Sequence, residues 1–234
     1  MAGISASGKL SDDLLIEDRH LLDGTPRRKW GSARPAELQA LILALGDILL
    51  AEPVPLMAKF TAGKIINLLG ARGAATVESP TSHELSSPQQ IKTLLAAASA
   101  TSPPYKSLTD GLLAVVDRVD WFKRRAGAFA SVNFEQSHYQ GILLGPGALE
   151  HRLDVVLGLT FLGPYTRFPD HMQKQARVFL PLSIGEFLFG DEEWKSAGVG
   201  DVLFNPASST CAMRCTQKPL LVLWCHVEGQ QHTP

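Results

Sequence analysis

The hydrophobic pattern of the chain changes near its middle. In the first half, apolar residues recur every three or four positions, which is the spacing of one face of an α-helix. Ser32 is a candidate cap of the first helix, and Ser107 with Asp110 resembles a capping box at the start of the last. The Ser-, Pro- and Thr-rich stretch 71–90 is predicted to be a loop. The spacing predicts helices over residues 35–49, 54–69, 89–99 and 107–124.

After Gly127 the apolar segments become short and rich in β-branched and aromatic residues, and Gly, Pro, Asn or Asp separates them. About eight closely spaced strands are typical of a closed or double-sheet antiparallel architecture, so we expect a jelly roll or small barrel. Because the helices precede the strands, the fold class is α+β. The predicted strands lie in AFASVNFEQ, YQGILLG, LDVVLGLTFL, ARVFLPLS, GEFLFG, DVLF, CAMRC and PLLVLWCHV.

These patterns divide the chain into four parts. We predict a polar arm over residues 1–31, a helical region over 32–126, a β-barrel over 127–229 and a tail over 230–234. The arm contains no apolar stretch of the kind found in signal peptides.

Composition narrows the classes of function. A net charge of −1, 45% hydrophobic residues and 19% charged residues describe a globular protein without the basic field that nucleic acid attracts. The apolar runs are too short to cross a bilayer. The three cysteines are crowded near the C-terminal end and do not form a disulfide framework, so we expect a cytoplasmic protein. No phosphate-loop or G-x-S-x-G spacing favours nucleotide binding or serine hydrolysis.

The stretch RFPDHMQKQARVFLPLS, residues 167–183, holds the candidate chemistry. Strand side chains alternate between faces, so this pattern predicts that five of its side chains project to one side of the sheet. They are His171, Gln173, Gln175, Arg177 and Phe179.

Several longer segments resemble the cupin-type dimethylsulfoniopropionate (DMSP) lyases. The resemblance covers about residues 107–229 and rests on GPGALEHRLDVVLGLTFLGPYTRFPDH, VFLPLSIGEFLFGDEEWKSAGVGDVLFNPASSTCAM and PLLVLWCHVEG. It implies an antiparallel cupin β-barrel after the N-terminal helices. It also implies a divalent metal (Zn, Fe or Mn) and β-elimination of DMSP to dimethyl sulfide and acrylate.

The framework of the family's two cupin boxes is present, but its chemical positions differ. The family's metal ligands correspond to Gln173, Arg177 and Cys211, with Phe179 where some members use tyrosine. The two tyrosines that serve as base or substrate contact correspond to Phe168 and Phe179. Of the ligand-type residues in the first box, His171 is retained.

These substitutions act against the family reaction. A transition metal needs three or four converging lone pairs from imidazole, thiolate or carboxylate groups. Gln173 offers only an amide oxygen, and Arg177 places a permanent positive charge where the dication would bind. Phenylalanine at the two tyrosine positions removes the general base. We therefore expect that the metal has been lost and that no cofactor is bound. The alternative is a divalent metal (Zn, Fe or Mn) held by an altered form of the family site.

Two interpretations of Arg177 remain open. It could be a structural arginine neutralised by Asp154, Glu186 or backbone carbonyl groups. Alternatively, Arg177 with Gln173 and His171 could hold a small carboxylate through bidentate hydrogen bonds. A lone histidine is more often a polar core residue than a ligand, and this applies to His171.

Three minor alternatives concern other side chains. Cys211 and Cys215 could form a redox pair, although buried free cysteines are commonly inert. A metal-free enzyme could also be built around Arg177 and Cys211. A different metal set could be drawn from residues near the barrel mouth, namely Glu135, His138, Tyr139 and His151.

The sequence thus leaves competing functions. One is a DMSP lyase-like enzyme, and another is a non-catalytic cupin that binds a small organic acid or a sulfonium carboxylate. A third is a partner subunit of an active paralogue. Neither nucleic acid nor a membrane is an expected partner, and pairing of barrels through edge strands is compatible with a homodimer.

Overall fold

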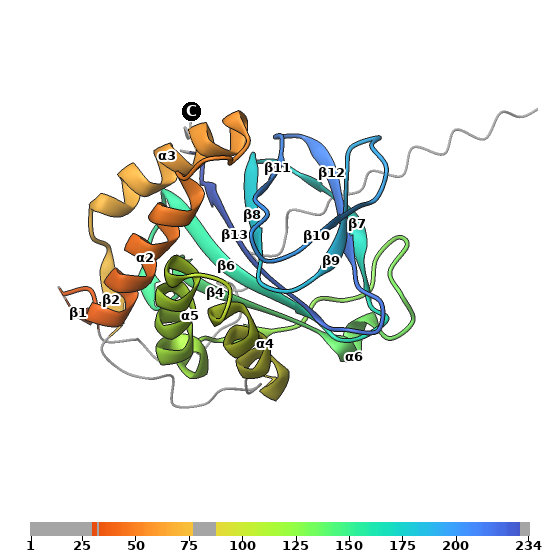
Figure 1. The fold of residues 1–234 in the computed structure, drawn as a ribbon, viewed down its shortest axis with the longest axis horizontal. Helices are drawn as coiled ribbons and strands as arrows, with labels where there is room; N and C mark the ends of the chain where they lie inside the picture. The colour runs from red at the N-terminus through yellow and green to blue at the C-terminus, as the bar shows by residue number, and fades with distance from the viewer. Residues whose placement is uncertain (1–29, 32, 77–87, 230–234) are drawn as a thin grey trace, which may run out of the picture.

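The computed structural model describes residues 30–31, 33–76 and 88–229. Its helices pack along one side of a large sheet, and a smaller sheet faces the other side of that sheet (Figure 1). The two sheets enclose the interior of an antiparallel cupin barrel. The N-terminal helices and the barrel confirm the predicted α+β class.

The described residues form four longer helices and two short helical turns, one of which, α6, lies at the end of the barrel (Figure 1). Within the described ranges, no helix has the length and apolarity that crossing a membrane requires. The helices are α2 (Ala36–Leu49), α3 (Leu56–Gly70), α4 (Gln89–Ser99), α5 (Pro103–Val115), the 3-10 helix η1 (Val116–Arg118) and α6 (Phe134–Ser137).

The larger sheet has nine strands in the described part of the chain. Their order is β1-β2-β5-β4-β6-β13-β8-β11, with β3 paired to β4, and all pairs are antiparallel except β4 with β5. The strands are β1 (Trp30–Gly31), β2 (Ala74–Thr76), β3 (Trp121–Phe122), β4 (His138–Gly145), β5 (Glu150–His151), β6 (Val155–Leu162), β8 (Arg177–Pro181), β11 (Leu203–Asn205) and β13 (Leu220–Val227).

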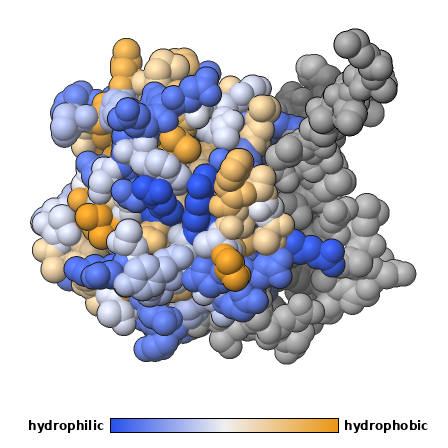
Figure 2. Space-filling view, turned by 90° about the vertical axis from the view of Figure 1, so that its right-hand side faces the viewer, coloured by the Kyte–Doolittle hydropathy of each residue, from blue (hydrophilic) through white to orange (hydrophobic). Residues whose placement is uncertain are grey.

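The smaller sheet has the antiparallel order β10-β9-β12-β7. Its outer face lies on the side of the molecule shown in Figure 2, where hydrophilic side chains occupy much of the centre. Its strands are β7 (Arg167–Gln173), β9 (Gly185–Phe189), β10 (Lys195–Ala197) and β12 (Ser209–Arg214).

The first three predicted helices are confirmed, with α4 spanning the expected residues. The predicted cap Ser32 lies outside the described residues. The last helix was placed wrongly, because α5 begins at Pro103 rather than Ser107. Proline fits the first turn of a helix, where its missing N–H costs nothing. Asp110 therefore lies inside the helix, where it forms an ion pair with Lys106.

Most of the predicted strands are confirmed, but the prediction for AFASVNFEQ was wrong. Phe129 adopts a left-handed backbone with φ of 60°, which interrupts an extended strand, and Phe134 begins the short helix α6. Within the stretch 71–90 that was predicted to be a loop, Ala74–Thr76 form the short strand β2. Residues 77–87 of that stretch lie outside the described residues.

The two faces of the large sheet have different partners. One face packs against the helices and includes Val178, Leu180 and Leu223. The opposite face belongs to a second apolar cluster, which includes Phe179 and Trp224 and extends to residues of the small sheet. Because strand side chains alternate, each long strand contributes to both cores.

A buried ionic network attaches the helices to the large sheet. Glu150 on β5 is fully buried and accepts hydrogen bonds from Arg34 Nε at 2.5 Å and from the Gly73 backbone N–H at 2.8 Å. Arg152 donates to the Leu68 carbonyl near the end of α3 and to the Asp154 carboxylate. Although burial opposes ionisation of Glu150, its hydrogen bonds with Arg34 and Gly73 prevail, and its pKa is lowered.

We predict that Glu150→Gln lowers the free energy of unfolding at pH 7 by about 3–5 kcal/mol, because it leaves the buried Arg34 cation without its counter-charge. The lowered folded-state pKa means that the wild-type carboxylate stabilises the fold above its unfolded pKa of about 4.3. This stabilisation disappears as the pH falls through the folded-state pKa, so the variant and the wild type should converge in acid. Urea denaturation across this pH range measures both effects.

Asp110→Asn provides the matched control. It removes one charge from the exposed pair with Lys106, and such pairs contribute less than about 1 kcal/mol. Equal stability losses in the two variants, or a Glu150→Gln effect that does not change with pH, would contradict the assigned role of Glu150.

Candidate functional site

Three polar side chains form a row across the inner face of the large sheet. Arg177 on β8 is paired directly with Asn205 on β11 and with His226 on β13. Residues directly opposite each other in antiparallel strands project from the same face. This face also carries Phe179 and Trp224, so the row lines the barrel interior.

The small sheet supplies the facing wall of the interior. On β12, Cys211 is paired with His171 of β7 and with Phe189 of β9. Two residue pairs further along, Gln173 lies opposite Ser209. The buried Asn205 amide donates to Gln173 Oε1 at 2.8 Å, so a hydrogen bond between side chains joins the two sheets here.

The chemical positions identified in the sequence therefore come from both sheets. Burial lowers the pKa of His171 and raises that of the Cys211 thiol, and the charge of Arg177 acts on both groups. The predicted alternation through Gln175 was wrong, because β7 ends at Gln173 and β8 begins at Arg177 in a different sheet. Gln175 lies in the connection between them, so it does not continue a strand face.

Arg177 is held by an aromatic ring rather than by a carboxylate. Its guanidinium carbon lies 4.3 Å from the centroid of the Trp224 ring, a separation typical of a cation–π contact. Among the described residues, the Arg177 side chain has no ion pair or hydrogen bond, and its buried Nε atom has no acceptor. Burial lowers its pKa to about 10, so the guanidinium stays charged at neutral pH.

The carboxylates proposed from the sequence to neutralise Arg177 bind other arginines. Asp154 accepts hydrogen bonds from Arg152, and Glu186 accepts one from Arg214 Nε at 2.6 Å. The interpretation of Arg177 as a residue neutralised by Asp154 or Glu186 was therefore wrong. Glu186 precedes the inward-facing Phe187 on β9 and so lies on the outer face of the small sheet, and the Asp154 side chain is 42% exposed beside Arg152.

The position of Trp224 depends on a glycine in the neighbouring strand. Gly158 of β6 is paired with Trp224, and a Cβ atom at Gly158 would lie 2.4 Å from the indole Cζ2. The missing side chain leaves room for the indole against the sheet. The indole N–H donates to Thr160 Oγ1 at 2.9 Å, which also fixes its orientation.

Aromatic and sulfur-containing side chains fill much of the remaining interior. Phe168, Phe179 and Cys211 all belong to the inner apolar cluster and are almost completely buried. His171 is half-buried, and its ring lies 5.2 Å from that of Phe168. His171 Nδ1 lies 3.1 Å from the Pro169 carbonyl oxygen, and burial lowers the pKa of the imidazole to about 4. At neutral pH the ring is uncharged and donates to that carbonyl.

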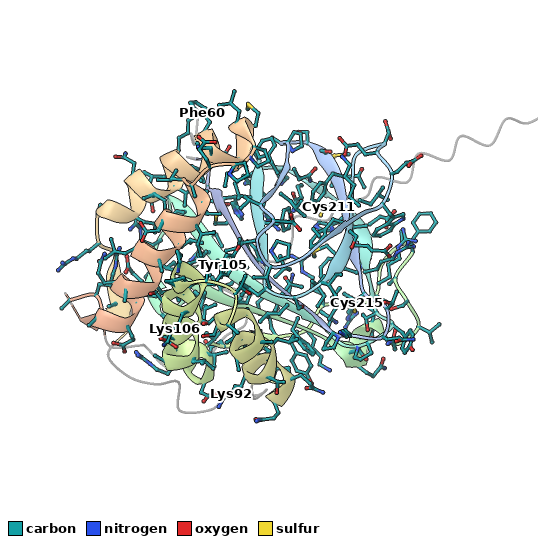
Figure 3. All side chains as sticks on the ribbon, viewed as in Figure 1. Phe60, Lys92, Tyr105, Lys106, Cys211 and Cys215 are labelled. Carbon is teal, nitrogen blue, oxygen red and sulfur yellow. The ribbon has the colours of Figure 1, made fainter. Side chains whose placement is uncertain are left out.

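The cysteines occupy separate buried positions. Figure 3 shows Cys211 within the ring of strands and Cys215 near the end of the barrel where α6 lies. Both are free thiols, and Cys215 Sγ lies 3.0 Å from the Gly163 carbonyl oxygen. Burial raises the pKa of Cys211 to about 12, so this thiol stays protonated. These features do not favour the redox pair considered from the sequence.

The alternative metal set near the barrel mouth is not assembled. His138 Nε2 accepts a hydrogen bond from the Arg124 backbone N–H, and Glu135 accepts one from the Ala126 N–H. His151 Nδ1 accepts the Gly147 N–H. Each of these groups is used locally, and no cluster of three or more His, Cys, Asp or Glu side chains suited to a metal occurs in the described ranges.

Sequence reasoning missed three residues that define the surroundings of Arg177, namely Asn205, Trp224 and His226. Trp224 and His226 are two positions apart on β13, and their rings are parallel to within 4° with centroids 5.8 Å apart. Their spacing indicates a shared strand face. The register that places this face beside Arg177 becomes visible only when β13 is paired with β8.

Together, the N-terminal helices, the two-sheet barrel and the interior site define a cupin with a helical extension. A family model described as dimethylsulfoniopropionate lyase matches residues 66–222. This match covers more than half of the chain, so the protein belongs to the DMSP lyase family.

Comparison with solved structures agrees at the level of the fold. DMSP lyase DddQ from Ruegeria pomeroyi DSS-3 aligns with a TM-score of 0.54 and 20% identity over 86% of this chain and 95% of that chain. A structure described with the DMSP lyases RdDddP and RnDddQII gives 0.52 and 18%, covering 85% and 95%. A search of curated proteins finds no significant match.

The side chains at the family's ligand positions do not fit a divalent metal. Gln173 Oε1 already accepts a hydrogen bond from Asn205, and the Cys211 thiol remains protonated. Arg177 introduces a cation with no lone pair. His171 is left as a single imidazole donor, whereas a protein zinc site uses at least three such ligands. No reaction step can therefore be assigned to a metal held by this set.

We predict that the wild-type protein binds zinc too weakly to retain it through equilibrium dialysis. A variant combining Gln173→His, Arg177→Glu and Cys211→His should retain about one zinc per chain, because it supplies imidazole and carboxylate ligands in place of an amide, a cation and a thiol. Elemental analysis measures the ratio, and circular dichroism checks that the variant folds. Stoichiometric zinc in the dialysed wild-type protein would contradict the prediction.

Proposed function

We propose that this member of the DMSP lyase family binds a small carboxylate in its barrel through Arg177, and that it does not perform the family's metal-dependent elimination. The observation that carries the proposal is the interior guanidinium, which has an aromatic support but no counter-ion among the described residues. DMSP and its acrylate product are carboxylates, so the proposed ligand keeps one chemical feature of the family reaction.

The energetic argument begins with the cost of removing a cation from water. An arginine in a largely apolar interior is costly unless an anion or hydrogen-bond acceptors compensate it. The carboxylates Asp154 and Glu186 bind other arginines, and Glu228 binds His226. A ligand carboxylate can satisfy the guanidinium with two parallel hydrogen bonds, which is the geometry that arginine favours.

Three features of the site favour such a ligand. The Trp224 ring supports one face of the guanidinium, so less side-chain freedom is lost on binding. Arg177 and His171 are also only half-buried, so solvent reaches this part of the interior. Gln173 Nε2 is a buried donor with no acceptor in the described structure, and it can share the carboxylate with Arg177.

In this proposal His171 does not bind the carboxylate. Its Nδ1 atom faces the Pro169 carbonyl, and the ring is neutral at physiological pH. In this tautomer Nε2 carries a lone pair and cannot donate to a carboxylate. We therefore assign carboxylate binding to Arg177 and Gln173, with His171 contributing to the wall of the site.

The positions of the family's tyrosines support the second half of the proposal. Phe168 and Phe179 are almost fully buried in the inner apolar cluster, and neither side chain can accept a proton. Elimination from DMSP requires a base at the carbon beside the carboxylate. Neither these side chains nor the ligand positions described above supply that base together with a Lewis acid.

We expect isothermal titration calorimetry to show that propionate and acrylate bind with millimolar or tighter affinity, and that Arg177→Met reduces the affinity by about 10-fold or more. The loss corresponds to removing a charge-assisted hydrogen bond worth about 1.5–3 kcal/mol. Methionine preserves a long apolar side chain beside Trp224, which limits disruption of the interior.

Arg214→Met is the matched control, because Arg214 stacks on Trp194 at 4.1 Å and lies on the outer face of the small sheet. It should bind both acids as the wild type does. Absence of binding heat in the wild-type protein would refute carboxylate binding. Release of dimethyl sulfide from DMSP would refute the proposed absence of elimination.

A further inference from the structure

The atoms around Arg177 include acceptors as well as donors. Asn205 Oδ1 and His226 Nδ1 are buried and have no hydrogen-bond partner within the described residues. Both side chains are almost completely buried, at 0% and 1% exposure. They come from the two strands that flank β8, so one lies on each side of Arg177. A buried acceptor without a donor is costly, so this pair indicates a ligand that donates hydrogen bonds.

One unused acceptor oxygen remains at the Asn205–Gln173 pair whichever way the two amides are oriented. In the structure, Asn205 Nδ2 donates to Gln173 Oε1, which leaves Gln173 Nε2 and Asn205 Oδ1 unused. If both amides were turned, Gln173 would donate to Asn205, and one N–H group and one oxygen would again be left over. The weak contact of Asn205 Nδ2 with the Ser209 carbonyl at 3.5 Å favours the first arrangement.

The acceptor on His226 is fixed by a carboxylate. His226 Nε2 lies 2.8 Å from Glu228 Oε2, and an ionised carboxylate can only accept, so Nε2 carries the proton. Burial lowers the pKa of His226 despite the opposing effect of Glu228, which keeps the imidazole neutral. The lone pair is therefore on Nδ1, the atom that lacks a donor. Stacking on Trp224 holds the ring in place.

We infer that the barrel selects a small hydroxycarboxylic acid, such as lactate or 3-hydroxypropionate, over the same acid without its hydroxyl group. This inference rests on the proposed carboxylate site. Arg177 and Gln173 bind the carboxylate, and the ligand hydroxyl donates its hydrogen to Asn205 Oδ1 or His226 Nδ1. The ligand thereby supplies an acceptor to the unused donors and a donor to an unused acceptor.

The charges of the site also discriminate against cationic ligands. A sulfonium or ammonium group near the carboxylate would approach the fixed charge of Arg177. A hydroxyl group carries no charge and provides the hydrogen that the acceptors lack. DMSP and alanine should therefore bind more weakly than the hydroxy acids of similar size.

The test is a calorimetric comparison of lactate and 3-hydroxypropionate with propionate on the full-length wild-type protein. We expect at least one hydroxy acid to bind about 10-fold more tightly than propionate, because propionate leaves both acceptors unpaired. His226→Phe and Asn205→Leu each remove one acceptor. The variant that removes the acceptor used by the hydroxyl should reduce this preference, taken as the ratio of the two affinities measured on the same variant, to less than about 3-fold.

His226→Gln is the matched variant, because its amide oxygen can replace the lost acceptor while the packing is changed to a similar extent. If His226 is the acceptor, the His226→Gln variant should retain the preference for the hydroxy acid that the His226→Phe variant loses. Thermal denaturation measurements identify the variants that fold.

Equal affinities for propionate and both hydroxy acids would overturn the inference and leave carboxylate binding intact. Absence of binding by all three acids would overturn the proposed carboxylate site itself. A preference for hydroxy acids that survives in Asn205→Leu and in His226→Phe would also overturn the inference, since the hydroxyl would then bind elsewhere.

Discussion

The contact between Arg177 and Trp224 is the interaction on which the interior of this barrel depends. It places a permanent positive charge in a space otherwise occupied largely by apolar side chains. The electron-rich face of the Trp224 ring attracts the guanidinium, but the ring cannot replace the hydrogen bonds that water would provide. Gly158 makes the contact geometrically feasible, because any larger residue would displace the indole.

Other arginines show how this chain usually handles a cation. Arg34 binds Glu150, Arg152 binds Asp154, and Arg214 binds Glu186. The first two pairs anchor the helical layer to the sheet, and the third lies on the outer face of the barrel. Arg177 differs from these residues because its hydrogen-bonding groups face the interior beside amide and imidazole side chains. Its surroundings resemble a binding site more than a structural ion pair.

Membership of the DMSP lyase family and the altered interior are compatible, because fold and chemistry depend on different residues. The strand pattern, the turns and the helical layer determine the barrel, and a family model recognises them across residues 66–222. The metal chemistry depends on a few inward-facing positions. The presence of Gln173, Arg177 and Cys211 at the family's ligand positions changes that chemistry, while the hydrogen bonds of the sheets remain. A fold can therefore persist while its site changes.

The sequence alone determined much of the architecture. Helical spacing located α2, α3 and α4, and short β-rich segments located most strands, because periodicity records which side of an element is buried. It also identified Gln173, Arg177 and Cys211 as positions to examine. It misplaced α5 and the segment before α6, where proline and a left-handed phenylalanine override the local pattern.

Only the tertiary structure decided which groups surround Arg177. Asn205, Trp224 and His226 are 28 to 49 positions away along the chain and reach Arg177 through strand pairing. It also directed Asp154 and Glu186 to other arginines. Periodicity describes a residue's own strand, whereas the partner of a buried charge depends on the register between distant strands, which local sequence does not encode.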